Sequence, residues 1–308
     1  MKKVFIDGSA GTTGLRIAER LAAREDLEII TLSEEKRKDR AARKEALNCA
    51  DIAFLCLPDD AAREAVSLVE NPDTVIIDAS TAHRTLPEWA YGFPELSKRH
   101  EEKICASKRI AVPGCHASGF IALVYPLIEA GLLGKEEHLT CHSITGYSGG
   151  GKKMIAEYES EDRNPLLDAP RQYGLTQQHK HLKEMKGMTG LETAPIFCPI
   201  VSDFYSGMTV TVPLFKSQVK GSVEDIKRVY AEKYQGTIVW YEENADEGGF
   251  ISGLKEGKKD GMKVTVAGNE ERILLIACYD NLGKGASGAA VECMNIALGV
   301  EKTKGLEL

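Results

Sequence analysis

The sequence predicts an α/β protein with two domains: a doubly wound parallel sheet first, and an α+β domain with a mostly antiparallel sheet second. In the first 114 residues, short apolar runs alternate with segments of helical periodicity, the pattern of parallel strands joined by crossover helices. After residue 119, long strand-like runs follow one another with few helices between them, and a helical pattern returns at the C-terminus. We therefore expect one domain from residues 1–114 with 286–308, and another from residues 115–285.

The first domain is expected to begin with a strand at residues 4–6, a glycine-rich turn and a helix. Apolar residues then recur at helical spacing, namely Leu15, Ala18, Leu21 and Ala22. The polar stretch 34–49 predicts a loop and a helix, and residues 61–70 predict another helix. Four further strands are expected in the runs LEIITLS, ADIAFLCLP, TVIIDAS and RIAVPG.

The second domain is expected to open with a helix after Gly119 and to continue as strands. The strand-like runs are LTCHSITG, APIFCPIV, GMTVTVPLF, TIVWYEE and KVTVAGNEERILLIACYDN. The runs 207–215 and 272–281 are long, and we expect them to contribute to a face between subunits. SGGGKK (148–153) predicts a loop. In the last helix, Val291, Met294 and Leu298 share one face.

The composition excludes several classes of protein. The 308 residues are 43% hydrophobic and 28% charged, with a formal net charge of −7, which argues against a surface for nucleic acid or anionic membrane. No apolar run is long enough to cross a bilayer, and the N-terminal run predicts a strand rather than a secretory signal. The eight cysteines show no CxxC spacing, so we expect a reduced, cytoplasmic protein with no metal site.

The glycine-rich turn predicts a phosphate-binding loop in a Rossmann-like domain. Glycines stand at positions 8, 11 and 14, after a strand and at the start of a helix. Glycine lets the backbone approach a pyrophosphate, and a helix N-terminus offers N–H donors. The spacing GxxGxxG differs from the usual GxGxxG, and a tight turn without a ligand is the alternative. The expected cofactor-binding residues are Gly8, Ser9, Ala10, Gly11, Thr12, Thr13 and Gly14.

The end of the second strand favours NADP over NAD. An acidic residue at this place would hold a ribose 2′-hydroxyl. Here Ser33 is followed by two glutamates and then by the basic residues Lys36, Arg37 and Lys38. A serine and a basic cluster suit a 2′-phosphate, so Ser33 and Arg37 are candidate contacts of the cofactor. The alternative is a solvated, charged helix face.

Cys115 is the candidate nucleophile. It follows Pro113 and Gly114 after a predicted strand, at the expected start of a helix. Helix N-termini favour the thiolate, which is the form that attacks carbonyl groups. In open α/β sheets ligands bind beyond the carboxyl ends of the strands, which is where Cys115 is expected. The alternative is a cysteine that only packs.

Reduction through a cysteine nucleophile also needs a proton-transfer group, and histidine is the usual one. The run QQHKHLKEM places His179 and His181 two residues apart, so both face the same side if the segment is extended. His116 is the neighbour of Cys115, but successive residues of a helix point about 100° apart. His179 and His181 are therefore the preferred candidates.

Six motifs occur in an order that resembles a known family. They are DGSAGTTG (7–14), DASTAHR (78–84), VPGCHASG (112–119), SGGGKK (148–153), QHKHLKEM (178–185) and DNLGKGASGAA (280–290). Together they are similar to the N-acetyl-γ-glutamyl-phosphate reductases, in their shorter variety, of the semialdehyde dehydrogenase family. The resemblance covers nearly the whole chain.

The resemblance implies an oxidoreductase of arginine biosynthesis. Such an enzyme reduces N-acetyl-L-glutamyl 5-phosphate with NADPH, through a thioester on Cys115, to N-acetyl-L-glutamate 5-semialdehyde and phosphate. The first domain would bind the dinucleotide, and the second would carry catalysis and oligomerisation in a homodimer or homotetramer. His181 would be catalytic, and His179 and Arg84 would bind the substrate, although which histidine moves the proton stays open. Further implied cofactor contacts are Ser148, Gly149, Asn281, Gly283, Lys284, Gly285 and Ala286.

Three other functions stay open at this point. An aspartate-semialdehyde dehydrogenase would use the same chemistry on a shorter substrate. A lysine-pathway reductase would act on a carrier-bound acyl phosphate, although the net charge of −7 argues against an acidic carrier protein. A nucleotide-binding sensor without turnover would use Cys115 as a redox switch.

Overall fold

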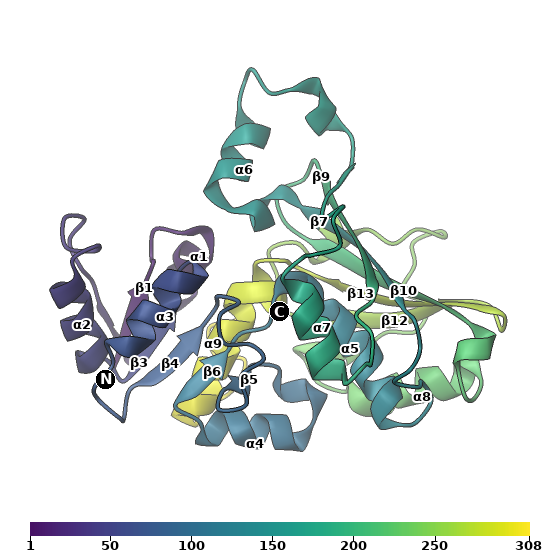
Figure 1. Cartoon of the computed structure of the whole chain (residues 1–308), viewed down its shortest axis with the longest axis horizontal. Coiled ribbons are helices and arrows are strands. Elements are labelled where there is room, and N and C mark those ends of the chain that lie inside the picture. Colours follow the sequence, from purple (N-terminus) through teal and green to yellow (C-terminus); the bar gives the residue numbers. More distant parts are fainter. The chain divides into compact units, whose positions relative to one another are not determined.

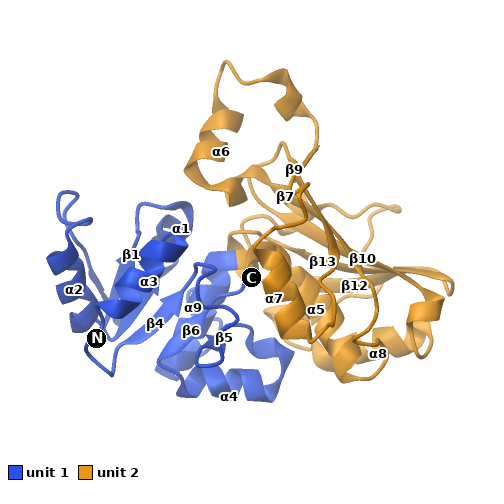
Figure 2. Ribbon diagram, in the orientation of Figure 1, with its two compact units in different colours: residues 1–113, 286–306 blue, residues 114–285, 307–308 orange.

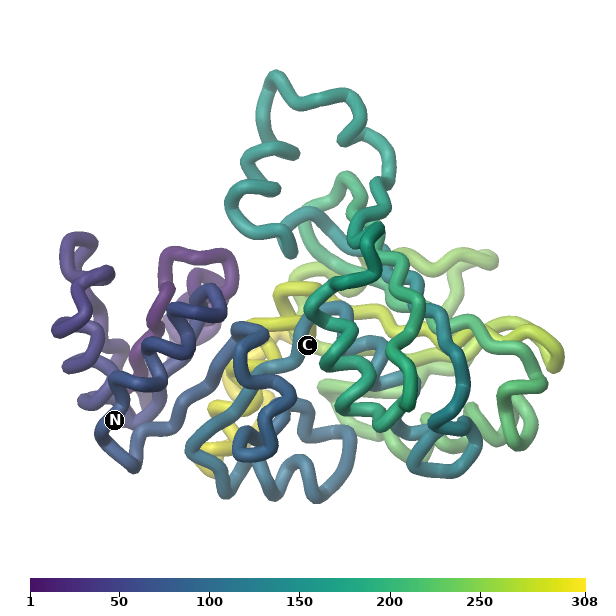
Figure 3. The backbone as a smooth tube through the Cα atoms, viewed as in Figure 1, coloured from purple at the N-terminus to yellow at the C-terminus, as the bar shows by residue number.

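The computed structural model describes residues 1–308, which form two compact units (Figure 2). Unit 1 comprises Met1–Pro113 and Ala286–Leu306, and unit 2 comprises Gly114–Gly285 and Glu307–Leu308. The chain leaves unit 1 after Pro113 and returns to it at Ala286, a course that Figure 3 traces. The last two residues group with unit 2, where the N–H of Asp260 donates to the carbonyl of Glu307 and the N–H of Glu307 donates to the Asp260 carboxylate.

Unit 1 contains a six-stranded sheet in which every pair of neighbours is parallel. Its strands are β1 (Lys2–Asp7), β2 (Leu27–Ile30), β3 (Ile52–Leu55), β4 (Val75–Asp78), β5 (Ala90–Tyr91) and β6 (Arg109–Ala111), in the order β2-β1-β3-β4-β6-β5. The order of strands reverses between β1 and β3. In such sheets ligands bind beyond the carboxyl ends of the strands at that switch point. The predicted Rossmann-like parallel sheet is confirmed.

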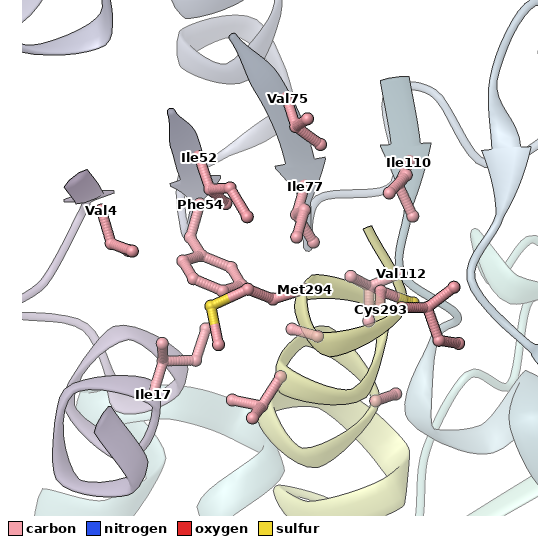
Figure 4. Close-up of a cluster of buried hydrophobic side chains, with 14 of the residues drawn as sticks. Val4, Ile17, Ile52, Phe54, Val75, Ile77, Ile110, Val112, Cys293 and Met294 are labelled. Carbon is pink, nitrogen blue, oxygen red and sulfur yellow. The ribbon is translucent and has the colours of Figure 1, made fainter. Parts of the chain in front are cut away.

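Helices cover both faces of this sheet because alternate strand residues point to opposite sides. On one face, Val4 and Ile6 of β1 join a core with α1 (Thr12–Leu21), α4 (Lys98–Ala106) and α9 (Gly288–Leu298), part of which Figure 4 shows. On the other face, Phe5 joins a core with α2 (Arg40–Cys49) and α3 (Asp59–Ser67). The sheet is therefore doubly wound.

The structure of unit 1 differs from the predicted elements at α1, β5, α4 and α9. Leu15 is 48% exposed and Ala22 is exposed as well, and the apolar residues that α1 buries are Ile17 and Leu21. Neither β5 nor α4 is predicted, because β5 has two residues and α4 buries only Ile104. The sequence predicts that α9 buries one apolar face, but every residue from 288 to 296 is buried.

Unit 2 contains a seven-stranded sheet that is mixed and mostly antiparallel. Its strands are β7 (Thr140–Gly146), β8 (Arg171–Gln172), β9 (Ile196–Ser202), β10 (Met208–Phe215), β11 (Val239–Tyr241), β12 (Met262–Gly268) and β13 (Arg272–Tyr279), in the order β11-β12-β13-β10-β7-β9-β8. Only the pairs β11–β12 and β7–β9 are parallel. The predicted α+β character of this region is confirmed.

Two helices of unit 2, α7 (His181–Thr189) and α8 (Val223–Lys233), each pack against α5 (Cys115–Glu129), and α5 also packs on β10 and β13. A fourth helix, α6 (Gly151–Glu159), lies in a lobe beyond the ends of β7 and β9 (Figure 1). The predicted SGGGKK loop is wrong, because this segment forms the 3₁₀ turn η2 (Tyr147–Gly150) and the start of α6. No helix of either unit has the length and apolar character needed to span a membrane.

Two carbonyls of α5 accept hydrogen bonds from tyrosine hydroxyls, one in α8 and one at the C-cap of α8. Pro126 lies inside α5 and has no N–H, so the carbonyl of Ala122 lacks the donor that a helix normally provides four residues later. The Oη of Tyr234 donates to this carbonyl at 2.7 Å, and the Oη of Tyr230 donates to the next one, Leu123, at 2.5 Å. Both tyrosines are buried, and the hydroxyl of Tyr234 stabilises the helix where Pro126 interrupts its ladder.

Candidate active site

Cys115 is the first residue of α5, and Gly114 is its N-cap. The N–H of Gly114 donates to the carboxylate of Glu184, in α7, at 2.8 Å. The first N–H groups of a helix have no acceptor within the helix, and a glycine cap has no side chain to accept from them. Cys115 is partly exposed, as a residue that meets a substrate must be. The predicted helix start at Cys115 is confirmed.

The other cysteines are less suited to attack a substrate. Burial raises the pKa of Cys278 to about 11 and also raises the pKa of Cys56 and of Cys141, so these thiols stay protonated. Of the eight cysteines, only Cys115 stands at the N-terminus of a helix.

Three histidines gather in unit 2 around the first turns of α5 and α7. The ring centroids of His179 and His181 lie 4.7 Å apart, and the ring of His116 lies 5.9 Å from His179 and 5.5 Å from His181. His181 is the first residue of α7, and its N–H donates to Nδ1 of His179 at 3.2 Å. The segment is not extended, because the chain turns into a helix at His181, but the two rings are neighbours.

His116 makes two hydrogen bonds through its ring. Its Nδ1 lies 2.6 Å from the hydroxyl of Ser143, and its Nε2 lies 2.7 Å from the hydroxyl of Tyr173. Burial, followed by the nearby His179, lowers the pKa of His116 to about 3. At neutral pH this imidazole is therefore uncharged, which suits it to orient Tyr173 rather than to act as an acid.

The uncharged His116 makes the stability of the fold depend on pH. In the unfolded chain this imidazole binds a proton below about pH 6.5, but in the folded chain it does so only near pH 3. Because the folded-state pKa is the lower one, protonation of His116 favours the unfolded chain. Above pH 6.5 this residue therefore leaves the free energy of unfolding undiminished, and the free energy falls as the pH drops toward 3. We expect the free energy of unfolding to fall by about 2 kcal/mol between pH 7 and pH 5 through this residue.

Urea denaturation at these two pH values measures the effect. A His116→Gln variant, whose amide does not titrate in this range, should lose about 2 kcal/mol less than the wild type over the interval. The exposed His138 provides the control, and His138→Gln should behave like the wild type. An equal loss in His116→Gln and the wild type would contradict the prediction.

Arg84 lies in unit 1, on the loop after β4. Its Nε donates to the carbonyl of Val112 at 2.8 Å, and its Nη2 donates to the carbonyl of Ala79 at 3.0 Å. Asp78 fixes the same loop, because its carboxylate lies 2.6 Å from Nδ1 of His83. Arg84 is buried and anchors the segment that leads to Cys115. Its role as a substrate contact stays a prediction.

The predicted phosphate loop of unit 1 requires glycine at two positions. Gly8 has φ +87°, and a Cβ there would lie 2.3 Å from the carbonyl oxygen of Cys56. A Cβ on Gly14 would lie 2.5 Å from the carbonyl oxygen of Gly8. Gly11 is the N-cap of α1 and brings no side-chain acceptor to the first turn, which begins with Thr12 and Thr13. This turn fits a pyrophosphate, because N–H groups at a helix N-terminus attract anions. Ser9 and Ala10 form its tip.

Ser33 and Arg37 lie together on a turn between β2 and α2. The N–H groups of Lys36 and Arg37 donate to the carbonyl of Ser33 at 2.9 and 3.0 Å, respectively. The guanidinium of Arg37 pairs with the carboxylate of Glu34. The alternative interpretation of this basic cluster as a helix face is wrong, because α2 begins at Arg40.

The other expected cofactor contacts lie in unit 2, except Ala286, and three of them are neighbours. The Nδ2 of Asn281 donates to the hydroxyl of Ser148 at 3.0 Å, and a Cβ on Gly149 would lie 3.2 Å from the same Nδ2. Gly285 packs against Cys115, since a Cβ on this glycine would lie 3.0 Å from the Cβ of Cys115. Lys284 is 1% exposed, in the π-helical turn Gly283–Ser287. Ala286 begins the part of the chain that groups with unit 1.

Sequence reasoning missed several residues of this site: His116, Ser143, Tyr173, Glu184 and Tyr279. The sequence favours His179 and His181 over His116, because successive residues of a helix point in different directions and His116 points away from Cys115. The rotation of one residue along α5 points the ring of His116 toward β7 and α7, where Ser143 and His181 lie. Tyr173 and Ser143 carry no sequence signal of this contact, because only the folded chain brings them together.

Comparison with known proteins identifies the family. Residues 3–104 match the model of the semialdehyde dehydrogenase NAD binding domain, and residues 115–281 match that of the semialdehyde dehydrogenase dimerisation domain. Proteins of Brucella ovis and Brucella canis, both named N-acetyl-γ-glutamyl-phosphate reductase, are each 47% identical to this chain, with 96% of this chain and 99% of the relative covered. This chain belongs to the N-acetyl-γ-glutamyl-phosphate reductases of the semialdehyde dehydrogenase family.

Solved semialdehyde dehydrogenases share the fold of this family member. Aspartate semialdehyde dehydrogenase II of Vibrio cholerae, complexed with ASA, has a TM-score of 0.73 at 15% identity, with 97% of this chain and 98% of that chain covered. The Candida albicans enzyme, solved with NADP, has a TM-score of 0.66 at 16% identity, with 96% and 98% covered. At these identities the likeness concerns the fold alone. As a semialdehyde dehydrogenase, the chain is an oxidoreductase with a nicotinamide cofactor.

Proposed function

We propose that the chain reduces N-acetyl-L-glutamyl 5-phosphate with NADPH to N-acetyl-L-glutamate 5-semialdehyde and phosphate, in arginine biosynthesis. The observation that carries this proposal is the position of Cys115 at the start of α5, in a chain 47% identical to reductases of this name. A thiolate at a helix N-terminus is suited to acyl transfer, and the histidines of α7 and its N-terminal loop can move the proton.

In the proposed first step, the Cys115 thiolate attacks the acyl carbon of the substrate. A carbon–sulfur bond forms, the bond from carbon to the phosphate oxygen breaks, and phosphate leaves with that oxygen and its electron pair. N–H groups at the start of α5 stabilise the charge that develops on the acyl oxygen. Arg84 and His179 remain the proposed contacts of the anionic substrate, because guanidinium and imidazole groups bind phosphate and carboxylate.

The proposed second step reduces the thioester on Cys115. NADPH, held by the glycine turn Gly8–Gly14, would supply the hydride that reduces the thioester carbon. His181 protonates the resulting oxyanion and takes the proton back as the carbon–sulfur bond breaks. The aldehyde then leaves, and Cys115 returns to a thiolate. The proposed assignment to His181 rather than His179 rests on its burial at the start of α7.

NADPH is the proposed cofactor, bound through the glycine turn Gly8–Gly14 at its pyrophosphate and through Ser33 and Arg37 at its 2′-phosphate. The proposed contacts nearer its nicotinamide end are Ser148, Gly149, Asn281, Gly283, Lys284, Gly285 and Ala286. A basic side chain after β2 supports a 2′-phosphate, since charge-assisted hydrogen bonds to phosphate are strong. NADPH would have to draw Arg37 away from Glu34.

Replacing Arg37 and Lys38 with glutamate is expected to weaken NADPH binding by about tenfold or more and to leave NADH binding nearly unchanged. Fluorescence titration of both cofactors gives the two dissociation constants. The double replacement of Lys98 and Arg99 with glutamate is the matched control, because it makes the same charge change on exposed residues of α4. Equal losses for NADPH and NADH would show that the basic cluster is only solvated.

We also propose that the protein works as a homodimer or homotetramer in the cytoplasm. The model matched by residues 115–281 is described as a dimerisation domain. The sheet of unit 2 supports this proposal, because Ile144, Phe215 and Leu274 are 43%, 64% and 37% exposed in β7, β10 and β13. A second copy covering this face would bury them, and light scattering gives the mass of the assembly.

The reaction run in reverse tests the proposed function. The protein is mixed with N-acetyl-L-glutamate 5-semialdehyde, phosphate and NADP, and the absorbance of NADPH is followed with a phosphate-free control. Phosphate-dependent formation of NADPH is expected. A signal only with aspartate semialdehyde or a longer homologue would keep the mechanism and replace the substrate. NADPH binding without a signal from any aldehyde would favour a redox sensor.

A further inference from the structure

We propose that Tyr279 is a positioning residue whose hydroxyl fixes the first turn of α5, and with it Cys115, for acyl transfer. This inference rests on the proposed function of Cys115. Tyr279 is the last residue of β13, and its side chain is fully buried. Its hydroxyl accepts a hydrogen bond from the N–H of Gly119 at 2.9 Å and donates one to the carbonyl of Cys115 at 2.5 Å.

The hydroxyl of Tyr279 bridges the carbonyl of Cys115 and the N–H of Gly119, which are one step of four residues apart at the start of α5. In an α-helix the carbonyl of one residue faces the N–H of the residue four positions later, and Cys115 and Gly119 are such a pair. A phenolic hydroxyl has one proton to donate and lone pairs with which to accept, and Tyr279 uses both functions here. One side chain from the sheet therefore holds both the carbonyl of Cys115 and the N–H of Gly119 in place.

Gly119 allows the tyrosine to come this close. A Cβ on residue 119 would lie 2.6 Å from the hydroxyl oxygen of Tyr279 and 2.8 Å from the Cβ of Val210. Glycine is a poor helix former, so a glycine one turn after the nucleophile needs a reason from packing. The approach of Tyr279 supplies that reason.

The segment that follows Tyr279 holds Cys115 from a second side. Gly285 leaves room for the Cβ of Cys115, and its N–H donates to the carbonyl of Asp280 at 3.0 Å. The carboxylate of Asp280 in turn accepts from the hydroxyl of Ser206 at 2.7 Å and from the N–H of Leu282 at 2.6 Å. Residues 279–285 are thus held by hydrogen bonds and contact Cys115, and Tyr279 bonds to the main chain of Cys115.

The orientation of the Cys115 main chain decides where its sulfur and the first N–H groups of α5 point. These N–H groups stabilise the thiolate and the oxyanion only if they are aimed at them. A misplacement of about 1 Å can lower a rate by about 100-fold. Tyr279 therefore influences the reaction through Cys115, without a contact to the substrate in this proposal.

The helix α5 provides two matched controls for this test. Tyr234 and Tyr230 are also buried, and their hydroxyls donate to carbonyls of the same helix, at Ala122 and Leu123. Replacement of any of the three tyrosines with phenylalanine removes the same atom from a contact with α5. Only Tyr279 bonds at the turn that carries the nucleophile.

The experiment compares Tyr279→Phe with Tyr234→Phe and Tyr230→Phe. The first measurement is the rate of alkylation of Cys115 by iodoacetamide against pH, followed by peptide mass, which needs no substrate. We expect Tyr279→Phe to react about tenfold more slowly at pH 7, with the midpoint of the profile moved to higher pH. The second measurement is reduction of the acyl phosphate, where kcat should fall by about 10- to 100-fold and KM for NADPH should stay unchanged. Both control variants should melt at lower temperature but keep the wild-type profile and kcat.

Four results would decide against the proposal or against its premise. A wild-type alkylation profile and kcat in Tyr279→Phe would overturn it, and so would the same changes in Tyr234→Phe. A wild-type protein that reduces no acyl phosphate would sink the proposed function, while the alkylation profiles still test Tyr279. Gly119→Ala is the second variant, since its methyl group displaces the hydroxyl from the helix side. If Tyr279→Phe does not fold, a wild-type profile in Gly119→Ala overturns the proposal.

Discussion

A Cys115→Ser variant is expected to lose reductase activity by about 10⁴-fold or more and to bind NADPH as the wild type does. A serine hydroxyl is a much weaker nucleophile than a thiolate, and the start of α5 stabilises an anion that serine does not form near neutral pH. Cofactor binding should persist, because the glycine turn proposed to bind the pyrophosphate lies between β1 and α1, in unit 1.

The acyl-enzyme shows directly whether Cys115 reacts. Without NADPH, the wild type mixed with the acyl phosphate should release about one phosphate per chain and gain the mass of the acyl group. Cys115→Ser should do neither. Cys105→Ser is the matched control, because Cys105 is exposed on α4 in unit 1 and should retain the burst. A phosphate burst in Cys115→Ser would refute the thioester mechanism.

The second large effect is expected at His181. Replacing it with asparagine should lower kcat by about 10²- to 10⁴-fold, the usual range for the loss of an acid–base group. His181 is buried at the start of α7, whereas its neighbour His179 is partly exposed and accepts the N–H of His181. We therefore expect His179→Asn to raise KM for the acyl phosphate more than it lowers kcat.

The pH dependence of kcat separates these two histidines. The variant that lacks the proton-transfer group should lose the limb of the profile that this group produces, and the other variant should keep it. His138→Asn serves as the control, because His138 is exposed and lies outside the histidine cluster. Loss of the limb in His179→Asn, with His181→Asn unaffected, would exchange the two roles.

The parallel part of the fold follows from local patterns in the sequence. Each strand of unit 1 except β5 is a short apolar run, and each run has a turn signal beside it. Both β5 and α4 escape this reasoning, since a strand of two residues has no periodicity and α4 buries one apolar side chain. The order of strands in either sheet depends on which segments meet in space, and no short window of sequence contains that information.

The candidate site is predictable from the sequence where a telling residue type stands at the junction of a strand-like run and a helix-like run. Cys115 stands between a strand and a helix, and the glycine turn stands between another such pair. His116 has no comparable signal, because its importance comes from Ser143 and Tyr173, which reach it from β7 and the segment before α7. The same holds for Tyr279, whose partner groups are backbone atoms far away in the sequence.

The proline in α5 makes the order of substitutions at two distant positions matter. Tyr234 supplies the donor that Pro126 lacks, so Tyr234→Phe alone leaves the buried carbonyl of Ala122 poorly satisfied, at a cost of about 1–3 kcal/mol. Once Pro126 has become alanine, the helix can supply its own N–H, and loss of the hydroxyl costs less. The two positions are thus epistatic: a lineage that changes residue 126 first can later exchange the tyrosine, and the reverse order passes through a weakened protein.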